Sequence, residues 1–233
     1  MKAVSYDRLV TKNWVNFKAA VPRGGISMLD ETLLFKWMTE FDHQIQTDKA
    51  YLSGLDAEIG DGDHGDNMAR GMSAVMHTFK TPNQSVAEQL KAIAFALISK
   101  VGGAAGPLYG SAFLRMSKAA VDTQQLDQLI QIGADAIADR GGANFGDKTM
   151  LDVWAYVPAM LEHHTLSSAG LAQLAAHTKP MQAKKGRASY LGERSVGHLD
   201  PGAVSSQELF QALLKAQSAL KTSPNQALKN GTD

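Results

Sequence analysis

The chain has 233 residues, of which 44% are hydrophobic, and its 23 basic residues are balanced by 23 acidic ones. This length allows one large domain or two small ones, and the balanced charge excludes the basic surface of a nucleic-acid-binding protein. The lack of cysteine excludes disulfides and thiolate metal sites. No apolar run is long enough to span a membrane and no signal peptide opens the chain, so we expect a cytoplasmic protein.

The first part of the chain divides into an extension and a helix. Residues 1–26 show no hydrophobic period and end in Pro22-Arg23-Gly24-Gly25, so we interpret them as an N-terminal extension and linker. Ser27 then predicts a helix cap, with Asp30 at the third helical position. Apolar residues at a spacing of four predict that this helix turns one face to the core; they are Leu29, Leu33, Trp37, Phe41 and Ile45.

A dense acidic stretch follows, Leu55-Asp56-Ala57-Glu58-Ile59-Gly60-Asp61-Gly62-Asp63-His64-Gly65-Asp66-Asn67-Met68. Clustered carboxylates repel one another unless a cation lies among them, and glycines let the backbone turn sharply and approach a ligand. This composition favours a hard cation held by oxygen ligands beside a bound group, and magnesium with phosphates is the commonest such case. A solvated acidic turn that caps a helix is the alternative.

Two helices and a glycine-rich connection are predicted next. Met68, Met72 and Val75 recur at helical spacing, which indicates core packing. Ser85 and Glu88 form a capping box for a second helix that ends at Gly102-Gly103. Residues 102–111 are small and place Pro107 in a first helical turn. Bare backbone N–H groups at such a helix start suit a phosphate, and a tight interhelical turn fits the segment equally well.

The third quarter of the chain is also helical. One helix from Thr123 should end at Arg140-Gly141-Gly142, and another should span Thr149 to His164 with a kink at Pro158. Residues 141–149 come close to a Walker A loop, but they carry one residue too many before the lysine and follow a helix instead of a strand, so we reject a P-loop. An alanine-rich helix is predicted from Leu166 to about Gln182.

The last part of the chain combines a basic cluster with a long polar loop. Lys184-Lys185-Gly186-Arg187 and Arg194 form the cluster, for which a solvated face is the usual explanation. The loop that follows, residues 189–202, is long and glycine-bearing, which is typical of a functional segment. Ser205 and Glu208 predict the cap of the final helix, and residues 223–233 are interpreted as a frayed tail.

The expected fold is therefore all-α, with about eight amphipathic helices and no strand. One domain over residues 27–222 would contain antiparallel helices whose glycine-rich loops gather at one end. An EF-hand is excluded, because Asp66 stands where that loop needs its glycine and Met72 where it needs its bidentate glutamate. A zinc site is excluded because the histidines lack ligand spacing.

Four motifs, in this order, are similar to those of the nucleotide-binding L subunit of dihydroxyacetone kinase. They are residues 55–68, Gly102-Gly103-Ala104-Ala105-Gly106-Pro107-Leu108, Gly146-Asp147-Lys148-Thr149-Met150 through Trp154, and Lys185-Gly186-Arg187 through Asp200-Pro201-Gly202. The resemblance spans about residues 28–222 and implies an antiparallel up-and-down barrel of eight helices, with the nucleotide site in interhelical loops at one end. The family often has serine where this chain has Ala105.

The resemblance also implies the roles of individual residues. Asp56, Asp61 and Asp63 would hold two magnesium ions that bridge to the phosphates of ADP. The residues that would contact the nucleotide are His64, Asn67, Ala104, Ala105, Gly141, Met150, Arg187 and Asp200. Met150 would pack on the base, and Arg187 would act as the catalytic residue by adding positive charge.

The chain has no room for a dihydroxyacetone-binding half, so it resembles the separate-subunit form of the family. That form implies a relay in which the phosphohistidine M subunit of the phosphotransferase system rephosphorylates bound ADP. The resulting ATP would then donate its phosphoryl group to dihydroxyacetone on a separate K subunit. No nucleic-acid or membrane partner is expected, and a homodimer is left open. The alternatives are the nucleotide domain of a related kinase for another ketose or a fatty acid, and a nucleotide-binding regulatory module.

Overall fold

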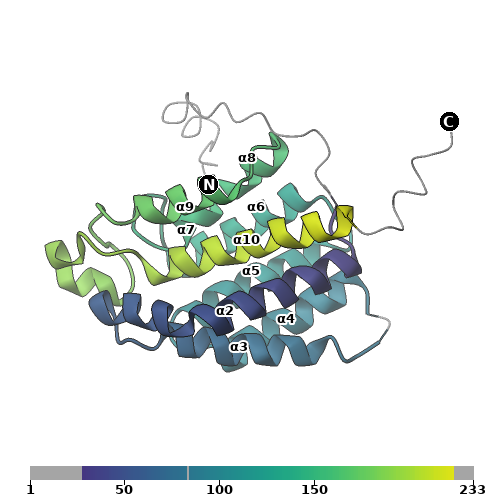
Figure 1. The fold of residues 1–233 in the computed structure, drawn as a ribbon, viewed down its shortest axis with the longest axis horizontal. Coiled ribbons are helices and arrows are strands. Elements are labelled where there is room, and N and C mark those ends of the chain that lie inside the picture. Colours follow the sequence, from purple (N-terminus) through teal and green to yellow (C-terminus); the bar gives the residue numbers. More distant parts are fainter. Residues whose placement is uncertain (1–27, 83, 223–233) are drawn as a thin grey trace.

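The computed structural model describes residues 28–82 and 84–222 of the chain (Figure 1). Within these ranges the secondary structure is helical without a β-strand, which confirms the expected all-α class. The elements are α2 (Glu31–Ile59), α3 (His64–Thr78), α4 (Val86–Lys100), α5 (Ala105–Ala119), α6 (Leu126–Gly141), α7 (Leu151–Trp154), α8 (Val157–Glu162), α9 (Ser168–His177), the 3₁₀ helix η1 (Arg187–Ser195) and α10 (Pro201–Lys221).

The helices contact one another in a closed ring. From α2 to α6 each helix packs against the next along the chain, and α6 packs against both α7 and α8. Helix α7 contacts α9, α9 contacts α10, and α10 returns to pack along α2 (Figure 1). From α2 to α6, where the connecting loops are short, consecutive helices run in opposite directions, and α7 with α8 continues this alternation as one interrupted helix. Every second loop therefore lies at the same end of the ring.

Aromatic side chains fill the centre of the ring. The Trp154 ring packs edge-on against Phe210, with ring centroids 4.9 Å apart. The Trp37 ring lies 6.4 Å from Phe210, and the Tyr109 ring lies 6.3 Å from Trp154. Both indole N–H groups are satisfied, because Trp37 Nε1 donates to the Leu209 carbonyl at 2.7 Å and Trp154 Nε1 donates to Ser206 Oγ at 3.1 Å. The core thus ties α2, α5 and α7 to α10.

Two predicted helix starts differ from the observed ones. Asp30 is itself the N-cap of α2 and accepts a hydrogen bond from the Leu33 N–H at 2.7 Å, while Ser27, the expected cap, lies outside the described residues. The final helix starts at Pro201 with Asp200 as its cap, so Ser205 does not cap it and instead lies inside it, fully buried. The capping box of Ser85 and Glu88 on α4 is confirmed.

Three other helix boundaries also move. Helix α6 starts at Leu126 rather than Thr123, because the preceding residues pair with the start of the described chain, where Leu29 N donates to the Gln124 carbonyl at 2.8 Å. The helix expected from Thr149 to His164 is split into α7 and α8, and Pro158 occupies the first turn of α8. Helix α9 ends at His177, before Pro180 and before the predicted end at about Gln182. Part of the predicted polar loop of residues 189–202 belongs to η1, which is kinked at Gly192.

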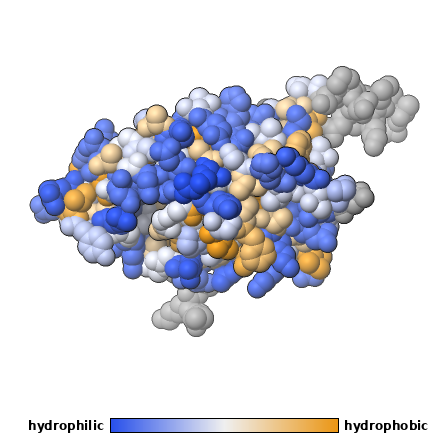
Figure 2. All heavy atoms as spheres, turned by 90° about the horizontal axis from the view of Figure 1, so that it is seen from below, coloured by the Kyte–Doolittle hydropathy of each residue, from blue (hydrophilic) through white to orange (hydrophobic). Residues whose placement is uncertain are grey.

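The surface seen in Figure 2 is mostly hydrophilic, with a narrower apolar strip across its middle. Among the exposed large apolar side chains are Phe35 of α2 and Phe95 and Ile98 of α4. In the part of the chain that the structure describes, no helix combines the length and the hydropathy needed to cross a lipid bilayer. The apolar residues are therefore mainly directed to the interior of the helical ring.

The buried carboxyl group of Glu208 on α10 faces the half-buried carboxyl group of Asp48 on α2. Glu208 of α10 is 3% exposed, and its Oε2 has no hydrogen-bond partner within the described ranges. Burial, followed by the charge of Asp48 on α2 and a hydrogen bond between the two carboxyl groups, raises the pKa of Glu208 to about 8. The nearby Lys215 offsets only part of this shift. Glu208 is therefore protonated in the folded chain at neutral pH.

We expect the free energy of unfolding to fall as the pH rises from about 4.5 to about 8. Over this window the folded chain keeps a proton on Glu208 that the unfolded chain has lost, so raising the pH favours unfolding. One such proton gives a slope of at most about 1.4 kcal/mol per pH unit. Glu208→Gln should flatten the dependence of the free energy of unfolding on pH, and Glu162→Gln, at an exposed position, should leave it unchanged. Urea denaturation at several pH values measures this dependence. Equal slopes in the Glu208 variant and the wild type would contradict this assignment.

Candidate nucleotide and metal site

Four loops meet at the end of the ring that lies at the left of Figure 1. They connect α2 to α3 (residues 60–63), α4 to α5 (101–104), α6 to α7 (142–150) and α9 to α10 (178–200). These are the segments that carry the four sequence motifs. The alternation of helix direction thus places residues far apart in the sequence at one end of the molecule.

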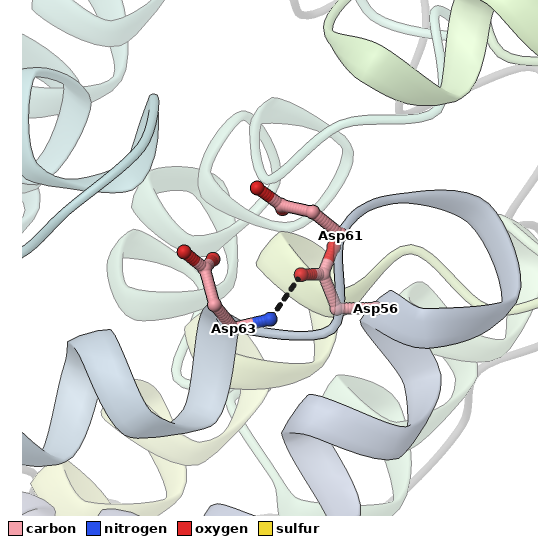
Figure 3. Close-up of side chains that lie close together, drawn as sticks. All are labelled: Asp56, Asp61 and Asp63. Carbon is pink, nitrogen blue, oxygen red and sulfur yellow. Dashed lines mark hydrogen bonds between the residues drawn. The ribbon is translucent and has the colours of Figure 1, made fainter.

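Three aspartates of the first loop form a cluster of carboxylates. Asp56 in the last turn of α2 accepts hydrogen bonds from the backbone N–H groups of Asp63 at 2.9 Å and His64 at 3.2 Å. This bends the chain back, so that ligand oxygens of Asp56, Asp61 and Asp63 lie within 4.8 Å of one another (Figure 3). Gly60 is required at this bend, because a Cβ there would collide with the carboxylate of Asp56.

The donor set of this cluster fits magnesium. All three ligands are carboxylate oxygens, Asp61 and Asp63 are exposed, and Asp56 is half-buried. Three anionic groups this close repel one another, and a hard divalent cation with oxygen ligands relieves that repulsion. Within the described residues this is the one cluster of histidine and acidic side chains that meets the geometry of a metal site.

Arg187 forms an ion pair with the cluster. Its Nη2 lies 3.0 Å from Asp61 Oδ2, and its side chain is 70% exposed. An ion pair this exposed contributes little to stability, so the guanidinium is free to exchange Asp61 for an anionic ligand. The structure thus brings the predicted catalytic residue to the predicted metal ligands, although 124 positions separate Arg187 from Asp63 in the chain.

The first turn of α3 carries His64 and Asn67 beside this cluster. His64 is buried, its Nε2 lies 2.9 Å from Ser205 Oγ, and burial lowers its pKa, while the carboxylates of Asp56 and Asp63 act in the opposite direction. Asn67 accepts a hydrogen bond from Arg70 at 2.5 Å. Its amide also touches the second loop, since a Cβ on Gly102 would lie 2.7 Å from Asn67 Oδ1. Only glycine allows this approach.

The start of α5 has the features of an anion site. Ala104 is the N-cap, its side chain makes no capping hydrogen bond, and Ala105 is the first helical residue. The first N–H groups of a 15-residue helix therefore point out of its end with the positive pole of the helix dipole. This agrees with the phosphate site predicted from the sequence. The two alanines follow Gly102, which lies against the Asn67 side chain in the first turn of α3.

The remaining predicted contacts belong to the third and fourth loops. Gly141 is the last residue of α6. Met150 directly precedes α7 and is buried. It packs closely on Gly202, because a Cβ added to that glycine would lie 3.4 Å from the Cβ of Met150. Asp200 caps α10 and accepts from the Ala203 N–H at 2.7 Å. Burial raises the pKa of Asp200 to about 7, Asp152 and Asp56 add to the shift, and Lys148 opposes it. Asp200 is thus electrically coupled to the aspartate cluster.

Two residues that sequence reasoning did not select shape these loops. Asp152 is buried and accepts from the N–H groups of Gly146 at 2.6 Å and Thr149 at 2.7 Å. Lys148 is 1% exposed, and its Nζ donates to the carbonyls of Met181, Ser195 and His198 at 3.1, 2.6 and 2.6 Å. The signal was the Gly146-Asp147-Lys148-Thr149 run, which the sequence presents as a rejected Walker A loop and as part of the third family motif without indicating a role for Lys148 or Asp152. Its lysine holds the 178–200 segment rather than a phosphate.

Comparison with known proteins supports the assignment of the four motifs. Residues 58–215 match the DAK2 domain. The chain belongs to the DAK2 domain family. Within it, the chain is 50% identical over 189 residues to the PTS-dependent dihydroxyacetone kinase, ADP-binding subunit DhaL, of Lactococcus lactis, covering 81% of this chain and 98% of that protein. It is 41% identical over 209 residues to the corresponding PEP-dependent subunit of Escherichia coli, with the same coverage.

More distant DAK2 proteins are longer than this chain. An L-erythrulose 1-kinase of Mycolicibacterium smegmatis is 35% identical over 192 residues, which are 74% of this chain and 33% of that protein. The crystal structure of the dihydroxyacetone kinase from C. freundii in complex with AMP-PNP and Mg²⁺ superimposes with a TM-score of 0.65 at 21% identity, covering 85% of this chain and 36% of the other. This likeness supports the fold, and the chain corresponds to about a third of that kinase.

Proposed function

We propose that the chain is the ADP-binding subunit of a dihydroxyacetone kinase that takes its phosphoryl group from a phosphohistidine protein. The observation that carries the proposal is the cluster of Asp56, Asp61 and Asp63, which lies at the same end of the ring as the N-terminus of α5. The relatives that share nearly their whole length with this chain are named ADP-binding subunits of such kinases. We assign this function to residues 27–222 and none to residues 1–26 or 223–233.

In this proposal each motif contributes one part of the nucleotide site. Asp56, Asp61 and Asp63 hold two magnesium ions, which when bound would neutralise phosphate charge. The N–H groups of Ala104 and Ala105 receive a phosphate at the positive end of α5. The other nucleotide contacts are His64, Asn67, Gly141, Met150 and Asp200, with Met150 against the base.

Arg187 is the proposed catalytic residue. Its guanidinium pairs with Asp61. Positive groups that meet the transferred phosphoryl oxygens stabilise the charge spread over them in the transition state. Because its ion pair is exposed, Arg187 loses little by turning from the carboxylate to the phosphate. Its position on η1 makes the 178–200 segment the part of the site that responds to nucleotide.

The proposed partners follow from what this chain lacks. Phosphoryl transfer needs an acceptor hydroxyl held in line with the phosphate, and no motif of this sequence resembles the ketose site of the family. We therefore assign acceptor binding to a separate K subunit and rephosphorylation of bound ADP to an M subunit of the phosphotransferase system, all in the cytoplasm. A kinase for another ketose is the second candidate, because an L-erythrulose 1-kinase is among the relatives.

We expect the purified chain, with ATP, magnesium and dihydroxyacetone, to form no significant dihydroxyacetone phosphate. Adding a cognate K subunit should allow one turnover from bound ATP, and sustained turnover should also need the M subunit. A coupled assay for dihydroxyacetone phosphate with each subunit omitted in turn measures this, and L-erythrulose in place of dihydroxyacetone tests the second candidate. Multiple turnovers by the lone chain would show that it holds its own acceptor site and would refute the subunit assignment.

A further inference from the structure

A continuous chain of hydrogen bonds leads from the core to His64. Trp154 Nε1 lies 3.1 Å from Ser206 Oγ, which lies 2.9 Å from the Tyr109 hydroxyl. That hydroxyl lies 2.8 Å from Ser205 Oγ, which in turn lies 2.9 Å from His64 Nε2. The first four of these side chains are fully buried, and His64 is 8% exposed. The chain thus crosses from α7 through α10 and α5 to the first turn of α3.

The proton positions along this chain follow from its first member. An indole N–H can only donate, so Ser206 Oγ accepts from Trp154. Ser206 has one proton of its own, and its other hydrogen-bond neighbour in the described part of the chain is Tyr109. Burial raises the pKa of Tyr109 above its usual range, so the phenol keeps its proton. Tyr109 therefore accepts from Ser206 and donates to Ser205, which is left with one proton to give.

Ser205 has two acceptors within reach. His64 Nε2 lies at 2.9 Å and the Gly202 carbonyl, one helical turn back, at 3.2 Å. The nitrogen is closer, and donation to it continues the series of hydroxyls, each of which strengthens the next. Donation to Gly202 would instead require Ser205 to accept from both Tyr109 and His64. The geometry therefore favours a proton on Ser205 that is directed at His64.

We propose that Trp154, Ser206, Tyr109 and Ser205 are positioning residues that fix His64 with Nε2 as a hydrogen-bond acceptor and the ring proton on Nδ1. His64 Nδ1 has no hydrogen-bond partner among the described residues, so its N–H is left for a ligand. The ring also feels the charges of Asp56 and Asp63. The role of that donor rests on the proposed nucleotide function, in which His64 contacts ADP. The tautomer itself does not depend on it.

The tautomer can be read directly by NMR of the full chain labelled with ¹⁵N-histidine, at about pH 8, above the ordinary pKa of histidine. Long-range ¹H–¹⁵N spectra distinguish the two ring nitrogens, and His64→Asn assigns the signal among the seven histidines. We expect the Nδ1–H tautomer in the wild type, which is opposite to the preference of free imidazole side chains. An Nε2–H tautomer in the wild type would overturn the inference.

Variants of the hydroxyl chain test its cause. Ser205→Ala should shift His64 toward the Nε2–H form, and Ser205→Thr, which restores a hydroxyl, should return it. Ser117→Ala is the matched control, because Ser117 is also a buried helical hydroxyl, but its hydrogen bond within the described residues goes to the Leu114 carbonyl of its own helix. Tyr109→Phe keeps the ring and should weaken the preference, so it serves if Ser205→Ala does not fold. An unchanged tautomer in the folded variant would contradict the proposal.

Binding of magnesium and ADP separates this inference from the proposed function. Loss of one oriented hydrogen bond should weaken the affinity of Ser205→Ala about fivefold, with recovery in Ser205→Thr and no change in Ser117→Ala. Failure of the wild type to bind ADP would refute the proposed function while leaving the NMR result valid. Wild-type binding together with an Nε2–H tautomer would refute only the positioning role.

Discussion

Replacing Asp63 with asparagine should abolish magnesium-dependent binding of ADP, with a loss of affinity of about a hundredfold or more. The carboxylate is one of three oxygen ligands that lie within 4.8 Å of one another. The substitution removes one carboxylate charge and one of the hard oxygen ligands that magnesium prefers, and a hundredfold loss of affinity corresponds to about 2.7 kcal/mol. Asparagine keeps the shape of the side chain and the backbone N–H that donates to Asp56.

The same substitution should leave the ligand-free fold intact. Asp63 is exposed, and removing one of three neighbouring negative charges relieves repulsion. We therefore expect its free energy of unfolding to stay within about 0.5 kcal/mol of the wild type. Stabilisation by ligand, about 2.7 kcal/mol at a hundred times the dissociation constant, should be lost.

Asp66→Asn is the matched control for this experiment. It is an exposed carboxylate on the same helix, and it pairs with Lys49 at 3.2 Å outside the cluster. Isothermal titration with ADP and magnesium, together with thermal unfolding with and without both ligands, measures binding and stability for each variant. Wild-type affinity in Asp63→Asn, or an equal loss in Asp66→Asn, would refute the metal assignment.

The aspartate cluster could be predicted from the sequence because its geometry is local. Asp56, Asp61 and Asp63 lie within eight residues, and the glycines between them indicate a sharp return of the backbone. The gathering of the loops could also be predicted, because antiparallel helices with short connections place alternate loops at one end. The family resemblance implied that Arg187 contacts the nucleotide, but its ion pair with Asp61 was not predicted, since nothing local in the sequence connects the two residues.

The role of Ser205 could not be predicted, because two helix-start signals compete within nine residues. Ser205 and Glu208 have the spacing of a capping box, but Asp200 and Pro201 are an equally good cap and first helical residue. The choice is made by tertiary packing: Ser205 is fully buried against Tyr109 and His64, and Glu208 faces Asp48. A sequence pattern records spacing along one helix and not which face meets the core.

The role of Lys148 was also missed, because it depends on tertiary packing. Replacing Lys148 should produce the second large effect that we expect. Its three acceptors lie 33 to 50 positions further along the chain. An ammonium group has three N–H donors, and the carbonyls of Met181, Ser195 and His198 match them in number. Burial lowers the pKa of Lys148, and the negative charge of Asp200 opposes that shift. The side chain therefore joins the third loop to the segment that carries Arg187.

Lys148→Met should destabilise the fold by about 3–5 kcal/mol, which is a large part of the stability of an ordinary domain. Methionine fills a similar volume but leaves three carbonyls without a donor, and each buried unsatisfied group costs about 1–3 kcal/mol. Lys185→Met is the control, because this lysine is exposed and lies in the same segment of the chain. It should change stability by no more than about 1 kcal/mol.

Hydrogen exchange can separate a local effect of Lys148→Met from a global one. If the lysine holds the 178–200 segment, the amides of that segment should lose protection more than those of α2 or α10, and the affinity for ADP should fall because Arg187 and Asp200 lose their positions. Urea denaturation gives the change in stability, and exchange followed by mass spectrometry gives its location. Uniform loss of protection would show that the lysine does not act mainly on the 178–200 segment. Wild-type stability in Lys148→Met would show that the three carbonyls are satisfied without this side chain.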